Sequence, residues 1–275
     1  MVLTGIVSVQ VGGAVAATLF DRVGPLGVVV LRLVSAALVM LLWARPWRRT
    51  WSRADVRVVL GFGAVLGAMN MTFYESLSRL PLGAAVTLEV LGPLTVAVLS
   101  GRRWRDGLWA VLAFSGVLVL GGGDLDLDPV GVAFGLGAAV CWGLYILLSV
   151  VTGRRFTGQQ GLGSAMVVAA VLVCPFGIPQ LADADLTAGL VLAGAAVGLA
   201  SSVIPYSLEQ AALRRLPPAV FGVLMSLEPG VAALAGLVVL GQRLTALGVL
   251  AVVLVVAASA GASLTGRSST PVATD

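Results

Sequence analysis

Long apolar runs follow one another along almost the whole chain, and short breaks of charged residues, glycine and proline separate them. A helix needs about 20 consecutive apolar residues to cross the hydrocarbon core of a bilayer. Ten runs come close to that length, and we predict that each is a membrane-spanning helix. They cover residues 2–20, 24–43, 57–77, 81–100, 107–122, 129–151, 162–181, 187–210, 217–240 and 244–264.

The composition supports this pattern. Of the 275 residues, 59% are hydrophobic and 11% are charged, and the mean hydropathy is +1.04. An ordinary soluble domain carries about 25% charged residues. The chain is therefore predicted to be an all-α integral membrane protein. No positive segment precedes the first apolar run, so we expect a first span rather than a cleaved signal peptide.

The arginines predict an orientation. All 17 basic residues are arginine, and cytoplasmic loops of membrane proteins carry the excess of positive charge. With the N-terminus in the cytoplasm, 13 arginines fall inside and three fall outside, namely Arg22, Arg79 and Arg243, while Arg32 lies within the second span. We therefore expect cytoplasmic N- and C-termini and a multi-pass protein of the bacterial inner membrane.

An internal repeat divides the chain into two halves. The stretch RLPLGAAVTLEVLGPL (79–94) and the stretch RLPPAVFGVLMSLEPG (215–230) agree at six of sixteen positions without gaps. Each half has five predicted spans, and because five is odd the second half must cross the membrane upside down. Secondary transporters use such inverted repeats, with the substrate site at the repeat interface. We predict a first repeat at 1–123, a second at 129–264, and a disordered cytoplasmic tail at 265–275.

Charged residues inside the predicted spans are the main candidates for function. A charge at the centre of a bilayer costs about 2.5–3.5 kcal/mol on insertion scales, so each one needs a physical reason. The charged residues inside the spans are Arg32, Glu75, Glu89, Glu209 and Glu228.

Glu89 and Glu228 are the most informative of these. Each is followed closely by a proline, Pro93 or Pro229, which permits a kink or break in a helix. A carboxylate beside a kink suits ammonium binding or proton transfer. The alternative is an ion pair with Arg32 that only holds helices together. For Arg32 itself, pairing with a carboxylate is the favoured interpretation, and contact with a substrate carboxylate is the other.

Other polar and aromatic side chains inside the spans are predicted to line the same site, because amides and hydroxyls in a bilayer usually face protein. Glu209, in a serine-rich run that Pro205 is expected to break, belongs with them, whereas Glu75 is expected to reach interfacial water. For the aromatic residues the alternative is anchoring at the membrane surface. The remaining candidates are Gln10, Asn70, Tyr74, Trp142, Tyr145, Tyr206 and Ser226.

The missing residue types exclude several classes of protein. Without lysine there is no P-loop, and without histidine there is no Ser-His-Asp triad and no imidazole metal site. We expect no cofactor, no metal, no catalytic residue and no nucleic acid. The expected partners are the lipid bilayer and a small-molecule substrate, with the proton as candidate coupling ion. The expected oligomeric state is monomer or homodimer.

Several motifs resemble bacterial threonine/homoserine exporters, which belong to the EamA group of the drug/metabolite transporter superfamily. The resemblance implies ten helices in two repeats and proton-driven efflux of small amphiphiles. Glu75 and Gln242 depart from the pattern, in which an apolar residue and an acid are expected. The motifs are Ser8–Gln10, Leu31–Leu33, Met69–Asn70, Phe73–Tyr74, Pro81–Glu89, Gly92–Pro93, Ala139–Tyr145, Pro205–Glu209 and Met225–Pro229.

The sequence thus favours a secondary exporter of small amino acids such as threonine and homoserine that works by alternating access. Glu89 and Glu228 would contact the ammonium or carry a proton, and Arg32 would hold the carboxylate or Glu89. Three alternatives stay open: an exporter of other metabolites or drugs, a membrane-embedded enzyme that uses carboxylates alone, and a structural membrane protein.

Overall fold

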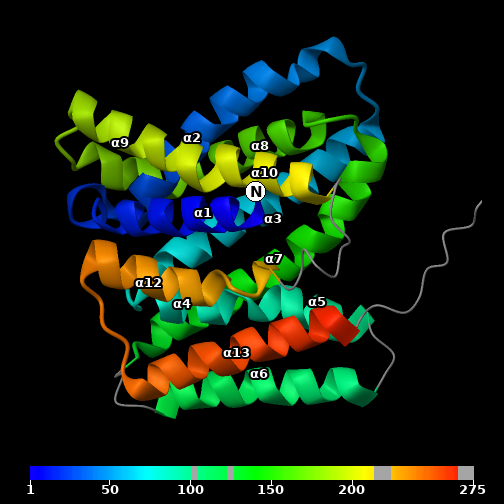
Figure 1. Cartoon of the computed structure of the whole chain (residues 1–275). Helices are drawn as coiled ribbons and strands as arrows, with labels where there is room; N and C mark the ends of the chain where they lie inside the picture. The colour runs from blue at the N-terminus through cyan, green and yellow to red at the C-terminus, as the bar shows by residue number, and fades with distance from the viewer. Residues whose placement is uncertain (101–103, 123–126, 214–223, 266–275) are drawn as a thin grey trace, which may run out of the picture.

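The computed structural model describes residues 1–100, 104–122, 127–213 and 224–265, and the regular structure of these residues is entirely helical (Figure 1). A π-helical turn, Leu199–Val203, joins two of the helices, and a 3₁₀ turn, Pro46–Arg48, follows another. The helices are α1 (Val2–Ala17), α2 (Phe20–Ala44), α3 (Arg53–Leu77), α4 (Leu82–Glu89), α5 (Leu91–Ser100), α6 (Trp104–Gly122), α7 (Pro129–Arg155), α8 (Gln160–Ala182), α9 (Ala188–Gly198), α10 (Ile204–Leu213), α12 (Glu228–Leu240) and α13 (Ala246–Thr265).

These helices confirm an all-α fold for a multi-pass membrane protein. In the described part of the chain, seven segments are long and apolar enough to cross a membrane. Three shorter apolar helices, Val2–Ala17, Gly107–Val119 and Glu228–Leu240, lie within the other predicted spans. Many large apolar side chains point outward; Leu42 is 70% exposed and Val238 is 80% exposed. A bilayer accommodates such side chains, whereas water does not.

The structure differs from the predicted spans in the interior of two of them. The fourth span, 81–100, consists of two helices that meet at Val90. The eighth span, 187–210, does not break at Pro205; the helix widens into the π turn just before that proline and then continues as α10. A proline in the first turn of a helix needs no N–H partner, which allows this continuation. Residues 217–223 of the ninth span and 266–275 of the tail lie outside the described residues.

The helices lie side by side in one bundle (Figure 1). Helix α2 packs against α8 and α9, α3 packs against α7 and α8, and α1 lies between α10 and α12. Helices α6 and α13 pair at one edge. The largest apolar core joins α2, α3 and α8 through side chains such as Leu33, Met40, Phe62, Leu66 and Met166, each at most 2% exposed.

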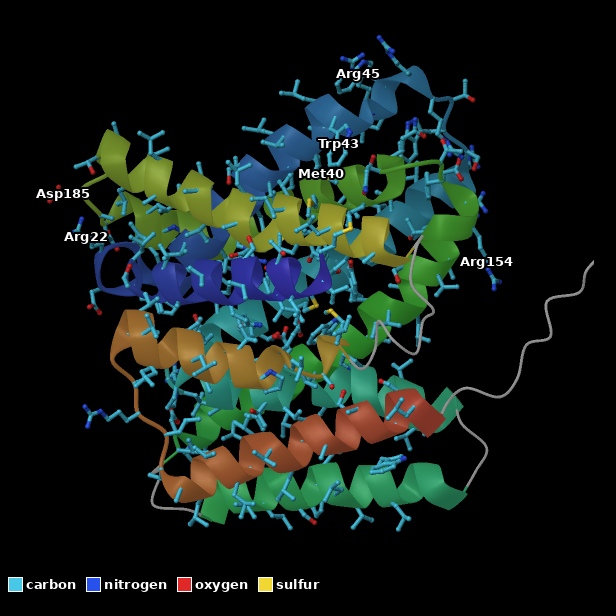
Figure 2. The ribbon with its side chains drawn as sticks, viewed as in Figure 1. Arg22, Met40, Trp43, Arg45, Arg154 and Asp185 are labelled. Atoms are coloured by element: carbon cyan, nitrogen blue, oxygen red, sulfur yellow. The ribbon has the colours of Figure 1, made fainter. Side chains whose placement is uncertain are left out.

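Figure 2 places charged residues at the two ends of the bundle. Arg45 and Arg154 lie at one end, and Arg22 and Asp185 lie at the other. Helix α2 runs from the end of Arg22 to the end of Arg45, where Arg45 takes a left-handed conformation with φ 46° and ends the helix before a proline.

At the end of the bundle near Arg154, ion pairs join α3 to α7. Asp55, in the first turn of α3, accepts hydrogen bonds from the side chain of Arg155 and, at 3.3 Å, from Arg49. The same carboxylate forms a capping box with Ser52 and so defines where α3 begins. The Arg49 guanidinium also lies 4.6 Å from the centre of the Phe156 ring. These contacts fasten the start of α3 to the end of α7.

At the opposite end, a second set of ion pairs joins the same two helices. Arg79 lies 3.3 Å from Asp128 and 3.7 Å from Glu75. Asp128 caps α7, because its carboxylate accepts the backbone N–H of Val130. That hydrogen bond and the neighbouring Arg79 hold the pKa of Asp128 below its usual value. The α3–α7 pair is therefore fastened at both ends, and Glu75 serves this fastening.

Candidate functional site

Arg32 is the buried cation of the candidate site. It lies in the middle of α2, is 7% exposed, and donates three hydrogen bonds. Its Nε donates to the hydroxyl of Ser202 at 3.1 Å and its Nη2 to the carbonyl of Ser201 at 2.9 Å. Its Nη1 donates to the hydroxyl of Tyr74 at 3.0 Å, and the Tyr74 ring centre is 5.3 Å from the guanidinium carbon.

These partners replace the ion pair that the sequence favoured. In the described part of the chain, Arg32 forms no ion pair with any carboxylate, Glu89 included. A hydroxyl, a carbonyl and an aromatic face are enough to hold a desolvated guanidinium in place. Arginine carries five N–H donors, and the described contacts use three of them. One N–H on each terminal nitrogen is left for another acceptor.

Ser201 and Ser202 belong to the π turn Leu199–Val203. A π turn is wider than an α-helical turn and alters the backbone hydrogen bonding of the helix. Two of its carbonyls accept side-chain donors from neighbouring helices: Ala200 from the hydroxyl of Ser8 on α1, at 2.7 Å, and Ser201 from Arg32. These partners were not among the predicted site residues. The only sequence signal for them was a pair of serines shortly before Pro205.

Glu89 and Glu228 each lie at a helix terminus. Glu89 is the last residue of α4 and Glu228 is the first residue of α12. Pro93 explains the first break, because a proline ring clashes with the carbonyl four residues earlier, here that of Glu89. Pro229 stands in the first turn of α12, where proline is tolerated. Pro93 has no N–H to donate, so the carbonyl of Glu89 lacks the backbone donor that a regular helix would supply.

The structure brings most of the charged candidates together around Tyr206. The charges of Arg32, Glu209, Glu89 and Glu228 all act on the Tyr206 hydroxyl. Glu228, which is 5% exposed, is acted on by Glu209 and Glu89, and Arg32 acts on Glu89. These residues come from α2, α4, α10 and α12. Three carboxylates and one guanidinium, which come from both halves of the chain, therefore lie within electrostatic range of the Tyr206 hydroxyl.

Aromatic rings extend from this cluster towards the end of α7. Tyr145 stacks on Tyr206, with ring centres 6.3 Å apart, and on Phe62 at 5.1 Å. Phe62 and Tyr145 also border a small pocket at the end of the bundle where Arg154 lies. It is lined by Phe62, Tyr145, Ser149, Thr152, Gly153, Phe156, Gly158, Gly161 and Leu162. Tyr145 therefore lies between the pocket and Tyr206, in contact with both.

The remaining predicted residues lie around the cluster in different ways. Asn70 shares a buried face of α3 with Tyr74, but its amide donates to the carbonyl of Leu66 in its own helix, at 2.9 Å. Trp142 packs against the apolar cluster of α1, α4 and α12. Gln10 and Ser226 are buried on α1 and just before α12, respectively. None of these residues contacts Arg32 through a hydrogen bond in the described structure.

Comparison with known proteins places the chain among transporters. The profile of the EamA-like transporter family matches residues 129–264. The Threonine/homoserine exporter RhtA of Salmonella typhimurium (strain LT2) is 41% identical over 273 residues, which cover 97% of this chain and 91% of that protein. RhtA of Escherichia coli (strain K12) is 39% identical over 278 residues, which cover 99% and 93%.

Solved structures with a similar fold include one crystal structure whose match spans nearly the whole chain. It superposes on this chain with a TM-score of 0.64 at 21% sequence identity, and the match covers 97% of each chain. At this identity the likeness concerns the fold alone.

Proposed function

Because this chain belongs to the EamA-like transporter family, we propose that it exports threonine, homoserine and similar small amino acids across the bacterial inner membrane. The two RhtA proteins carry that activity in their names and match nearly the whole chain at about 40% identity. The observation that supports it most directly is Arg32: it is buried, it is held by neutral groups, and it keeps two N–H donors for a carboxylate.

The carboxylates would serve the other end of the substrate. An α-amino acid carries its ammonium group and its carboxylate on the same carbon atom, so both groups need partners close together, and the charges of Arg32, Glu89, Glu209 and Glu228 all act on the Tyr206 hydroxyl. In this proposal Glu89 contacts the ammonium, because the break at Pro93 leaves the Glu89 carbonyl as a further acceptor beside its carboxylate. Glu228 carries the coupling proton, and the Tyr145 and Tyr206 rings line the path. Because the charge of Glu89 acts on Glu228, binding of the ammonium at Glu89 would favour release of the proton from Glu228 and so couple the two fluxes.

Two inverted repeats, 1–123 and 129–264, are the framework we propose for this site, with both termini in the cytoplasm. Corresponding helices pack against one another: α2 against α8, α4 against α12, and α6 against α13. An inverted two-fold axis between the halves would produce such self-paired contacts. The family profile covers the range proposed for the second repeat. The placement of Arg45 and Arg154 at one end of the bundle supports the orientation (Figure 2).

Individual contacts support the same symmetry. Gly5 of α1 faces Leu208 of α10, and Gly137 of α7 faces Thr72 of α3; a Cβ built on either glycine would lie 3.8 Å from the Cβ of its partner. Leu208 and Thr72 are 136 positions apart, the same separation as between the two copies of the repeated stretch. The two contacts are therefore equivalent under the proposed repeat.

Transport into inverted membrane vesicles tests the proposal. Vesicles that contain the protein should accumulate radiolabelled threonine or homoserine when a proton gradient, acid inside, is imposed, and vesicles without it should not. Accumulation of an aromatic dye with no accumulation of either amino acid would favour a drug exporter instead. No accumulation of any of these solutes would contradict the proposed function.

Substitution of Glu228→Gln tests the coupling role. The amide keeps the shape and cannot release a proton, so we expect gradient-driven accumulation to fall to the background of empty vesicles. Exchange of labelled for unlabelled threonine, which needs no net proton movement, should persist. Glu75→Gln, at the outer ion pairs, is the control and should accumulate threonine normally. Wild-type accumulation by the Glu228 variant would show that this carboxylate does not carry the proton.

A further inference from the structure

We propose that the π turn Leu199–Val203 is a one-residue insertion in the second repeat, and that it positions Arg32 to bind the substrate carboxylate. This inference takes the identity of the substrate, a small amino acid, from the proposed function. It assigns a positioning role to Ser201 and Ser202, which do not themselves contact the transported amino acid.

The register of close helix contacts gives the first line of support. Gly63 of α3 lies so near α8 that a Cβ there would meet the Ala165 carbonyl oxygen at 2.6 Å and the Val168 side chain. Gly198 of α9 meets α2 in the same way, at the Arg32 carbonyl oxygen (2.7 Å) and the Ser35 side chain. In both cases the two contacted residues are three positions apart. The Gly63 and Gly198 contacts are therefore equivalent in the two halves.

A second pair of equivalent contacts lies further along the same helices. Thr72 of α3 faces Gly137, and Leu208 of α10 faces Gly5. Thr72 is nine positions after Gly63, whereas Leu208 is ten positions after Gly198. One residue has thus been added between these two points in the second half, and the π turn lies between them. A π turn is the form that a single inserted residue takes inside a helix.

The insertion supplies the acceptors that hold Arg32. In a regular α-helix each carbonyl accepts the N–H four residues later, and in α3 the side chains that bond to such carbonyls, Asn70 and Thr72, belong to the same helix. The π turn offers the Ser201 carbonyl to Nη2 of Arg32 and brings the Ser202 hydroxyl to Nε. The equivalent part of α3, from Gly63 to Thr72, is regular helix. The acceptors therefore exist in the second half only.

The cation is also present in one half only. By the same contacts, the position equivalent to Arg32 is Ala165, which is fully buried in α8. A two-fold symmetric site would treat both ends of a substrate alike. An amino acid has chemically different ends, so a binding site for it must break the symmetry. Arg32 and the π turn together make the site asymmetric. The three bound N–H groups fix the orientation of the guanidinium and so the direction of its two remaining N–H donors.

Substitution of Ser202→Ala tests this role in proteoliposomes. We expect KM for threonine to rise about tenfold, as for loss of a hydrogen bond to a charged group, with Vmax within a factor of two. Inhibition by the amino alcohol that corresponds to threonine, which lacks the carboxylate, should stay within twofold of wild type. Ser263→Ala, which removes a hydroxyl that bonds to its own helix α13, should change neither value.

Two results would overturn the positioning role: a KM for threonine that stays at the wild-type value, or a fall in Vmax at unchanged KM. An equal loss of affinity for threonine and for the amino alcohol would also overturn it. These outcomes differ from failure of the proposed function, in which the wild-type protein itself would not transport threonine.

Deletion of Ala200 tests the insertion separately. Removal of an extra residue should convert the π turn to regular helix without rotating α10, so the protein should purify as a monodisperse, helical species with raised KM. Deletion of Leu66 from the regular α3 should instead rotate the rest of that helix and abolish folded protein. An Ala200 deletion that misfolds as the Leu66 deletion does, or that keeps the wild-type KM, contradicts the proposal.

Discussion

At the scale of single residues, the chemistry of this protein depends on how one buried cation is satisfied. The sequence contains four intramembrane carboxylates that were candidates to neutralise Arg32. In the described structure it is held by two serines and a tyrosine instead. An ion pair inside the protein would occupy the guanidinium permanently. Neutral acceptors leave its charge available, which is what recognition of a substrate carboxylate needs.

Substitution of Arg32→Lys should therefore impair transport although the charge is kept. A lysine ammonium is a point charge with three N–H donors and no planar fork, so it cannot keep three fixed bonds and still present two further donors. We expect at least a tenfold loss of kcat/KM for threonine export in proteoliposomes. Arg22→Lys, an exposed arginine at the end of the bundle, is the matched control and should transport normally (Figure 2). Normal kinetics in the Arg32 variant would remove the carboxylate role.

At the scale of helices, the candidate site residues lie where helices end, begin or change their hydrogen bonding. A helix break follows Glu89 near Pro93, a helix begins at Glu228 with Pro229 in its first turn, and the π turn widens a third helix beside Arg32. In contrast, α3 and α7 run without a break and are fastened at both ends by Asp55 with Arg155 and by Arg79 with Asp128. Interrupted helices surround the site, and continuous, fastened helices support it.

The fastening at the Asp128 end should depend on pH in a defined direction. The folded-state pKa of Asp128 is lowered, so its ion pair contributes stability above the ordinary aspartate pKa of about 3.9, and that stability is lost as the pH falls through the lower folded-state value. Asp128→Asn should lower the thermal unfolding midpoint in detergent by a constant amount between pH 8 and about pH 5. The difference from wild type should shrink below about pH 4.

The control for this measurement is Asp185→Asn, an exposed carboxylate at the same end of the bundle, which should not change the midpoint at any pH (Figure 2). A difference between wild type and the Asp128 variant that grows as the pH is lowered would contradict the assigned role.

At the scale of the whole molecule, two equivalent seams differ in how they are held. The α3–α7 seam carries ion pairs at both ends. The α1–α10 seam has the Ser8 hydroxyl bound to the π turn, and apolar side chains such as Ile6 and Ala212 pack there. Alternating access requires some helix contacts to open while others persist. The α3–α7 pair is suited to move as one body, and the α1–α10 seam is suited to open.

Disulfide cross-links across the two seams test this difference. Gly137→Cys with Thr72→Cys, and Gly5→Cys with Leu208→Cys, place Cβ atoms about 3.8 Å apart, the usual separation in disulfides. Both should form in a background where Cys141 and Cys174 are alanine. The first cross-link should leave threonine export intact, and the second should block it until a reductant is added. Block by the first with free export by the second would reverse the assignment.

The sequence by itself determined the all-α membrane fold, the buried charges and the transporter class. Apolar runs about 20 residues long leave no other stable structure in a bilayer, and a buried charge is too costly to keep without a use. Those arguments concern each segment and its solvent, so Arg32, Glu89 and Glu228 could be found without knowledge of their neighbours. The relatives agree with the resulting class.

Only the tertiary structure decided which groups meet. The partner of Arg32 depends on the register between α2 and a helix 170 positions further along the chain, as its bond to Ser202 shows. One inserted residue sets that register, and in the sequence it looks like any other apolar position. Hydrophobicity predicts whether a residue is buried. It does not predict which acceptor atoms lie about 3 Å from a guanidinium, as hydrogen bonds require. The expected ion pair was therefore wrong, while the expected burial of Arg32 was confirmed.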